Sequence, residues 1–85
     1  MIFHTYILFS EKLNGYYIGY TGDSLKSRLH KHLHSAKGHT SKANDWKIVY
    51  SQTFDTKQAA MKREIEIKAW KSKIKIEKLI LSSTE

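Results

Sequence analysis

Cysteine and proline are both absent from the 85 residues, and the chain has no long hydrophobic run. Without cysteine there is neither a disulfide framework nor a thiolate metal site, so a reducing cytoplasm is the expected location. No apolar run approaches the roughly 18 residues of a membrane span, and the start MIFH lacks the basic residues of a signal peptide. We therefore expect no membrane partner.

Acidic residues are few compared with basic ones. Fifteen Lys and Arg stand against eight Asp and Glu, which gives a formal net charge of +7. This excess in a short chain favours a polyanionic partner, most often nucleic acid, although a merely soluble basic protein could share it. The basic residues are not gathered on one amphipathic helix, which disfavours an anionic membrane surface as the partner.

The length predicts one domain over residues 1–85, because a chain this short has no room for a second core. Apolar residues make up 40% of the chain, which is too many for a disordered protein. Segments rich in β-branched and aromatic residues predict strands over 2–9, 16–21 and 46–54. The order of elements is strand, strand, helix, strand, helix, helix. An α+β fold with a small antiparallel sheet and helices packed on it is expected.

The first two strands form a hairpin whose loop length decides where two tyrosines point. With a loop of two or four residues, Tyr6 and Tyr17 lie on the same face of the sheet. A four-residue loop over 11–14 also sets Tyr17 opposite Leu8, while a loop of odd length would separate the tyrosines. An Asn-Gly pair at residues 14–15 supports a tight turn.

The first helix follows Asp23 or Ser24 as its N-cap and carries two polar residues beside its apolar stripe. Arg28 and His32 are one turn apart at the border of that stripe, so both are expected to rest near the sheet. Either they are a snorkelling arginine and a satisfied histidine, or they bind an anion. The apolar stripe itself consists of Leu25, Leu29, Leu33 and Ala36.

The second helix begins after Asp55 or Thr56, with Asp55 and Gln58 placed for a capping box, and runs to about Lys71. Glu64 interrupts its apolar arc. A carboxylate there is either half of a salt bridge, to Lys68 or Arg28, or a ligand for a hard cation such as Mg²⁺. The apolar arc consists of Ala60, Met61, Ile65 and Ile67, and a short last helix is expected from Ser72 to about Leu81.

The histidines do not predict a zinc site. His30, His32 and His34 are spaced by two residues, and a helix cannot bring three rings with that spacing to one ion. His30 and His34 could supply two ligands, but no third or fourth is evident.

Taken in order, these residues resemble the GIY-YIG nuclease superfamily. The pattern begins with TYIL at 5–8 and YIG at 17–19, and continues through Arg28, His32 and Glu64. The ending RE-x-x-I-K-x-W at 63–70 is similar to that of the small stand-alone, single-domain bacterial members. Tyr20 stands where the excision-repair members carry a lysine, and the glycine that usually opens the first motif is missing.

The resemblance implies a three-stranded antiparallel sheet flanked by helices (β-β-α-β-α-α) and a metal-dependent endonuclease that hydrolyses phosphodiester bonds of nucleic acid. DNA is the expected substrate, and Mg²⁺ or Mn²⁺ is the expected cofactor, held by Glu64. Arg28 would bind the phosphate, and Tyr6 would orient its neighbours. Tyr17 and His32 remain alternatives for the general base. The implied catalytic residues are Tyr6, Tyr17, Arg28, His32 and Glu64.

Gly19 lies on the same strand face as Tyr17 and would either let a phosphate approach closely or mark a bulge. A catalytically inactive, basic nucleic-acid-binding module on the same scaffold is the alternative function, and a protein-interaction domain is a third. Lys73, Lys75 and Lys78 are equally explained as a solvated face. In the alternative, the lysines that contact the backbone are Lys37, Lys42, Lys47, Lys71, Lys73 and Lys75. The preference for DNA over RNA and the oligomeric state are left open.

Overall fold

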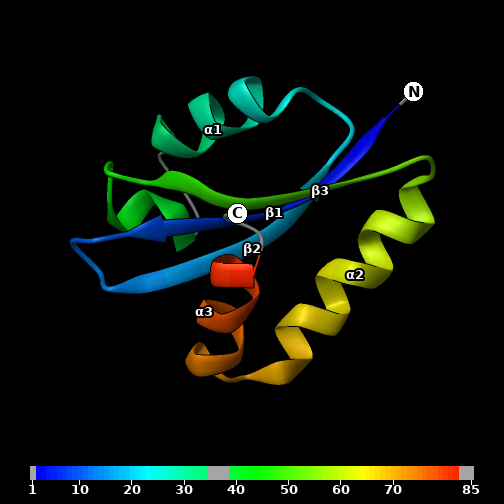
Figure 1. The fold of residues 1–85 in the computed structure, drawn as a ribbon. Helices are drawn as coiled ribbons and strands as arrows, with labels where there is room; N and C mark the ends of the chain where they lie inside the picture. The colour runs from blue at the N-terminus through cyan, green and yellow to red at the C-terminus, as the bar shows by residue number, and fades with distance from the viewer. Residues whose placement is uncertain (1, 35–38, 83–85) are drawn as a thin grey trace.

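The computed structural model describes residues 2–34 and 39–82 of the chain (Figure 1). The predicted order of strands and helices and the α+β class are confirmed. Ala36 and Lys37, which the sequence assigned to a buried stripe and to a binding surface, lie outside the described residues. The elements are β1 (Phe3–Ser10), β2 (Gly15–Thr21), α1 (Leu25–Leu33), a short 3₁₀ helix (His39–Lys42), β3 (Lys47–Phe54), α2 (Lys57–Trp70) and α3 (Lys73–Ser82).

The three strands form an antiparallel sheet in the order β2-β1-β3. Helix α1 covers one face of the sheet, and α2 and α3 lie against the other (Figure 1). The central strand β1 is therefore covered on both faces, and four of its consecutive residues, 5–8, are buried. Strand β2 lies at an edge of the sheet, so side chains from the helices on both faces can reach it.

The hairpin has the four-residue loop that fixes the faces of the two tyrosines. Ser10 pairs with Gly15, and Leu8 pairs with Tyr17, as expected for a loop over 11–14. Asn14 adopts a left-handed backbone conformation (φ 49°), and its N–H donates to the Glu11 carbonyl at 3.2 Å. Asparagine tolerates this conformation better than most residues, so the turn is encoded locally.

The alternation along β1 divides the interior into two clusters, one on each face of the sheet. On the α1 face, Leu25, Leu29 and Leu33 pack against the first cluster, as the helical spacing predicted. That cluster contains Tyr6, Leu8, Ala43 and Trp46. The cluster on the other face contains Ile7, Ile18, Ile67 and Ile76.

Helix α2 differs from the prediction at two points. Its N-cap is Thr56, whose Oγ1 accepts from the Ala59 N–H at 3.2 Å, so the capping box from Asp55 was wrong. Ile65 is 58% exposed and does not belong to the buried arc. The stripe of α2 that rests on the sheet is therefore narrow. Ala60 and Ile67 form the fully buried part of that stripe.

A buried hydrogen bond fixes α2 against the central strand. Thr5 Oγ1 donates to the Ala60 carbonyl at 2.7 Å, one turn before Glu64. Thr5 is fully buried, so the bond is shielded from water and satisfies a group that would otherwise be left unpaired. It thereby fixes the part of α2 from which Glu64 projects.

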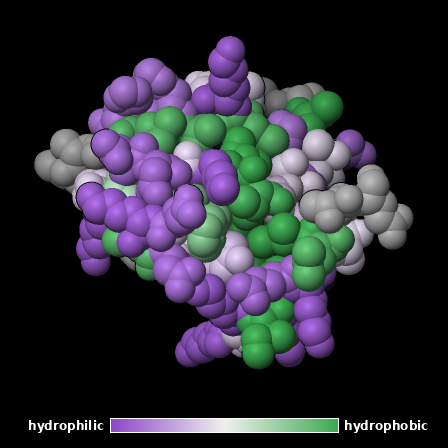
Figure 2. Space-filling view, turned by 60° about the vertical axis from the view of Figure 1, so that its left-hand side comes forward, coloured by the Kyte–Doolittle hydropathy of each residue, from purple (hydrophilic) through white to green (hydrophobic). Residues whose placement is uncertain are grey.

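Some apolar surface remains on the outside. On the face shown in Figure 2, hydrophobic side chains reach the surface between larger areas of hydrophilic ones. A domain this small cannot cover all of its apolar residues. The large exposed hydrophobic residues are Ile2, Leu13, Ile65, Ile74 and Leu81. Among the described residues, no helix combines the length and apolar character that crossing a membrane requires.

Candidate functional site

A cleft of about 390 Å³ opens beside β2, and residues from both layers of helices line it. Because β2 is an edge strand, side chains above and below the sheet can reach the same space around it. The predicted site residues Tyr6, Tyr17, Arg28 and Glu64 all line this cleft. Its full lining is Tyr6, Tyr17, Gly19, Tyr20, Thr21, Gly22, Arg28, Lys57 and Glu64.

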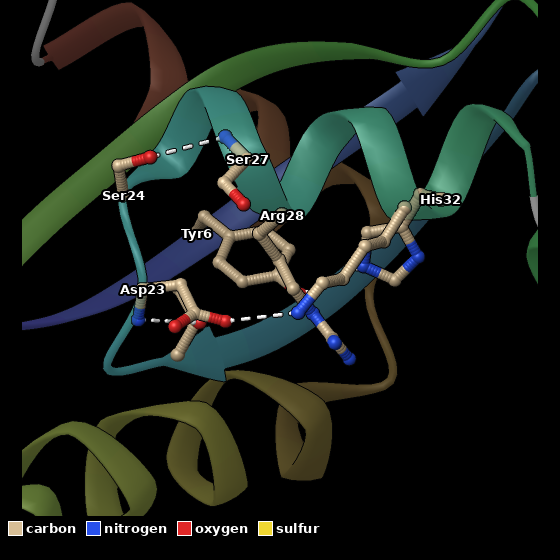
Figure 3. A network of polar contacts seen from close by, with 8 residues as sticks. Tyr6, Asp23, Ser24, Ser27, Arg28 and His32 are labelled. Atoms are coloured by element: carbon tan, nitrogen blue, oxygen red, sulfur yellow. Dashed lines mark hydrogen bonds and ion pairs between the residues drawn. The ribbon is translucent and has the colours of Figure 1, made fainter.

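Tyr6 lies at the centre of a network of polar contacts under α1 (Figure 3). Tyr6 as a whole is 2% exposed. The Tyr6 Oη accepts from the Arg28 Nε at 3.2 Å and lies 2.8 Å from His32 Nε2. Arg28 and His32 therefore do rest against the sheet, as predicted, and both contact the hydroxyl of Tyr6.

The protonation states of Tyr6 and His32 follow from their burial. Burial raises the pKa of Tyr6, an effect that the Arg28 guanidinium partly opposes. Burial, followed by the nearby charge of Arg28, lowers the pKa of His32. Near pH 7 the phenol is thus protonated and the imidazole neutral. Since Arg28 only donates, the phenol hydrogen is assigned to His32 Nε2, which places the imidazole hydrogen on Nδ1.

Local sequence explains the position of α1. Ser24, rather than Asp23, is the N-cap, and its Oγ accepts from the Ser27 N–H at 3.1 Å (Figure 3). With Ser24 as the cap, the helix begins at Leu25, and this start fixes the rotation of the helix about its axis. With that rotation the leucines face the sheet, and Arg28 and His32 reach Tyr6 from one side of the helix.

Tyr17 connects the cleft to the first cluster. Its ring centroid lies 4.9 Å from that of His32 and 6.4 Å from that of Trp46, both in edge-on arrangements. The side chain is half-buried and lines the cleft, whereas His32 is 6% exposed and does not line it. The two tyrosines thus lie on the same face, as the loop length predicted, but only Tyr17 combines this packing with partial exposure.

Glu64 enters the cleft from α2, on the other side of β2. Its side chain is 14% exposed, and its Oε2 lies 3.3 Å from Lys68 Nζ. The salt bridge to Lys68 that the sequence allowed is present, while Arg28 donates to Tyr6 instead. Glu64 therefore both forms an ion pair on its own helix and presents a carboxylate to the cleft.

The donor set around Glu64 suits some cations better than others. Among residues 2–34 and 39–82, no group of three or more His, Cys, Asp or Glu could enclose an ion. The cleft instead has the Glu64 carboxylate, with Tyr17, Tyr20 and Thr21 among its other lining residues. Mg²⁺ is commonly held by one or two carboxylates while it keeps several waters and binds substrate phosphates. The residues fit such a cation and do not fit four-coordinate zinc.

Gly19 is required by the ring of Tyr6. The two residues pair directly across the β1–β2 ladder, so Gly19 does not lie at a bulge. A Cβ added to Gly19 would lie 2.5 Å from the Tyr6 Oη and 2.7 Å from its Cζ. Gly19 also lines the cleft, but its clearest role is to leave room for the buried phenol.

We expect Gly19→Ala to lower the free energy of unfolding by about 1–3 kcal/mol, because the buried Tyr6 ring would have to shift. Gly15→Ala is the matched control, since a Cβ there meets only the Leu13 carbonyl at 3.7 Å. Urea titration followed by circular dichroism measures both variants. Equal stability of Gly19→Ala and the wild type would show that the Tyr6 ring can move at little cost.

The sequence analysis did not single out Lys57, which also lines the cleft. A signal was available, because Lys57 precedes Glu64 by seven residues, which is two helical turns on the same face. The lysines of the alternative binding surface lie elsewhere, and none of those described lines the cleft. Lys73, for example, donates to the Asn14 carbonyl at 2.9 Å and supports the hairpin.

Comparisons with known proteins agree with this fold. The family model of the GIY-YIG catalytic domain matches residues 2–78. The solution NMR structure of the UPF0213 protein BH0048 from Bacillus halodurans is similar, with a TM-score of 0.61 and 30% sequence identity. The match covers 98% of this chain and 86% of that one. No curated protein matches the chain. Since the family model spans nearly all of the residues and the solved fold agrees, the chain belongs to the GIY-YIG family.

Proposed function

We propose that the protein is a metal-dependent endonuclease that hydrolyses phosphodiester bonds of DNA. The family implies a nuclease and a nucleic-acid substrate. The observation that carries the finer proposal is the single cleft to which α1 contributes Arg28, β2 contributes Tyr17 and α2 contributes Glu64. Arg28 and Glu64 come from helices that are distant in the chain and lie on opposite faces of the sheet, so a structural role alone does not explain why their polar groups meet at β2.

The reaction needs more than one catalytic effect. Phosphodiester hydrolysis requires a barrier reduction of about 20 kcal/mol, near the upper end of the usual enzymatic range. A general base supplies about 10²- to 10⁴-fold, so positioning and electrostatic stabilisation must provide most of the remainder. The cleft contains groups of each kind.

Arg28 supplies the anion-binding group. Its Nε donates to Tyr6, which holds the side chain so that the guanidinium remains at the cleft. A guanidinium presents a planar fork of donors that matches two oxygens of a phosphate. Tyr6 and His32 then act as positioning residues, because their contacts under α1 orient that fork.

Tyr17 is the group we assign to the attacking water. It lines the cleft, whereas His32 is buried and its Nε2 contacts the Tyr6 hydroxyl. To accept a proton from the water the phenol must first be in its phenolate form, so this role requires a nearby positive charge that stabilises the phenolate. Arg28 supplies one such charge in the same cleft.

Glu64 is the residue that would hold the cation. When bound, Mg²⁺ or Mn²⁺ supplies Lewis-acid stabilisation of the charge that develops on the phosphate oxygens. The Glu64 carboxylate is 14% exposed, so it can be reached from the cleft while it is held by its helix and by Lys68.

A cleavage assay tests the proposal. Purified protein is incubated with plasmid, single-stranded and branched DNA, and with matched RNA, in Mg²⁺, Mn²⁺ or EDTA. We expect cleavage of DNA with either metal and none in EDTA. Cleavage that persists at the same rate in EDTA would exclude the metal, and cleavage of RNA alone would exclude the proposed substrate.

One observation favours the inactive binding module as a second candidate. The Glu64 carboxylate already has a partner in Lys68, so it can be satisfied without a metal ion. The net charge of +7 would still attract nucleic acid. Salt-sensitive binding that is the same with and without Mg²⁺, together with no cleavage of any substrate, would establish this function instead.

A further inference from the structure

Lys57 lies at the first position of α2, directly after the N-cap Thr56, and lines the cleft. Its side chain is exposed, and within the described part of the chain it makes no hydrogen bond or ion pair. The other charged residues of the cleft differ in this respect, since Arg28 donates to Tyr6 and Glu64 pairs with Lys68. Lys57 is thus a cation that faces the cleft with its donors available.

The position is unfavourable for the helix itself. A positive charge in the first turn opposes the helix dipole, which favours negative charge at that end. No acidic residue in the first turn of α2 compensates for it. The stability of α2 therefore gives no reason for a lysine at this position, and a ligand in the cleft does.

The spacing on α2 separates Lys57 from the reacting phosphate. Seven residues correspond to two turns on one face, or about 10 Å along the helix axis, between Lys57 and Glu64. Successive phosphates of one strand in a duplex advance by about 3.4 Å along the duplex axis. The separation thus corresponds to about three phosphates, so a strand whose scissile phosphate lies at Glu64 and Arg28 would place one of the next three phosphates, rather than the scissile one, within reach of Lys57.

The charge of the cleft leads to the same conclusion. Its charged lining residues are Arg28, Lys57 and Glu64, so the positive and negative charges of Arg28 and Glu64 cancel and Lys57 leaves the lining net positive. A polyanion is attracted by that remaining charge. We propose that Lys57 binds a backbone phosphate within about three positions of the scissile one and so sets the register of the strand in the cleft, an inference that rests on the proposed function.

Binding measurements test this without requiring cleavage. Fluorescence anisotropy in EDTA with a labelled DNA duplex compares wild type, Lys57→Ala and Lys62→Ala across a series of salt concentrations. Lys62 is the matched control, because it is an exposed lysine of α2 that does not line the cleft. We expect Lys57→Ala to weaken binding about tenfold and to reduce the log–log salt slope by about 0.9, as for the loss of one phosphate contact.

Two further readouts separate this role from a structural one. We expect Lys57→Ala to leave the thermal midpoint unchanged or to raise it, because a charge that opposes the helix dipole is removed. In cleavage assays the variant should raise KM and leave kcat nearly unchanged. A set of duplexes, each lacking one of the three phosphates on one side of the cleavage site or the other, locates the contact. Removing the phosphate that Lys57 binds should abolish the difference in affinity between Lys57→Ala and wild type, and removing the others should not.

The two failures can be told apart. If Lys57→Ala binds with the same affinity and salt slope as Lys62→Ala, the phosphate contact is excluded whether or not the wild type cuts DNA. If binding behaves as expected but the wild type cuts no substrate with any metal, the contact stands as one to a bound strand and the nuclease proposal fails.

Discussion

Glu64→Gln is expected to reduce DNA cleavage by about three orders of magnitude, because the loss of several kcal/mol of Lewis-acid stabilisation corresponds to roughly that factor. The substitution keeps the shape of the side chain and removes its charge. The fold should persist, since the packing of α2 depends on Ala60 and Ile67 and on the buried bond from Thr5. Single-turnover cleavage in Mg²⁺ measures the effect, with circular dichroism to confirm the fold.

Lys68→Ala is the matched control for this change. It breaks the same ion pair from the other side and leaves the carboxylate in the cleft. Lys68 is about half exposed, so the pair contributes no more than about 1 kcal/mol to stability. We expect cleavage within a few-fold of wild type. Titration with Mn²⁺, followed by electron paramagnetic resonance, should show binding by wild type and Lys68→Ala but not by Glu64→Gln.

Two outcomes would contradict this account. Full cleavage by Glu64→Gln would exclude the carboxylate as a metal ligand. An equal loss of cleavage in Glu64→Gln and Lys68→Ala would instead identify the ion pair, and not the free carboxylate, as the important feature.

Arg28→Lys is expected to lower the rate of cleavage by about 100-fold, in the range seen when one preorganised donor to a developing anion is removed. The lysine keeps the positive charge but lacks both the planar fork and the Nε that donates to Tyr6. Charge alone should therefore not rescue activity. The measurement is kcat on a DNA substrate at fixed Mg²⁺, together with urea titration to confirm that the variant is folded.

The control for Arg28 lies on the same helix. Lys31 forms an exposed ion pair with Asp23 at 3.1 Å and does not line the cleft. Lys31→Ala should leave cleavage unchanged. If Arg28→Lys cut DNA at the wild-type rate, a point charge would be sufficient, and the fork geometry and the contact with Tyr6 would have no part in catalysis.

The local parts of this site follow directly from the sequence. The period of two along a strand and the four-residue loop place Tyr6 and Tyr17 on one face, and the period of the helix places Arg28 and His32 on one ridge. These regularities depend only on neighbouring residues, so they can be read without knowledge of the tertiary fold. Because Arg28 and His32 share one side of α1, both can contact Tyr6.

Other features depended on how the elements pack. The sequence could not determine whether Ile65 was buried, because that requires knowing how narrow a stripe of α2 touches the sheet. The reason for Gly19 was similarly hidden, since it depends on the ring of Tyr6 across the ladder. Lys57 was overlooked because an exposed lysine has no distinctive pattern until a cleft is seen beside it.

By itself, the sequence determined the order of the elements, the faces of the hairpin and the polar ridge of α1, because each of these depends on short-range backbone geometry. Only the tertiary structure decided that Glu64 shares a cleft with Tyr17 and Arg28. Arg28 and Glu64 belong to helices on opposite sides of the sheet, and they meet at Tyr17 because β2 is an edge strand and the buried bond from Thr5 to Ala60 fixes α2 beside it.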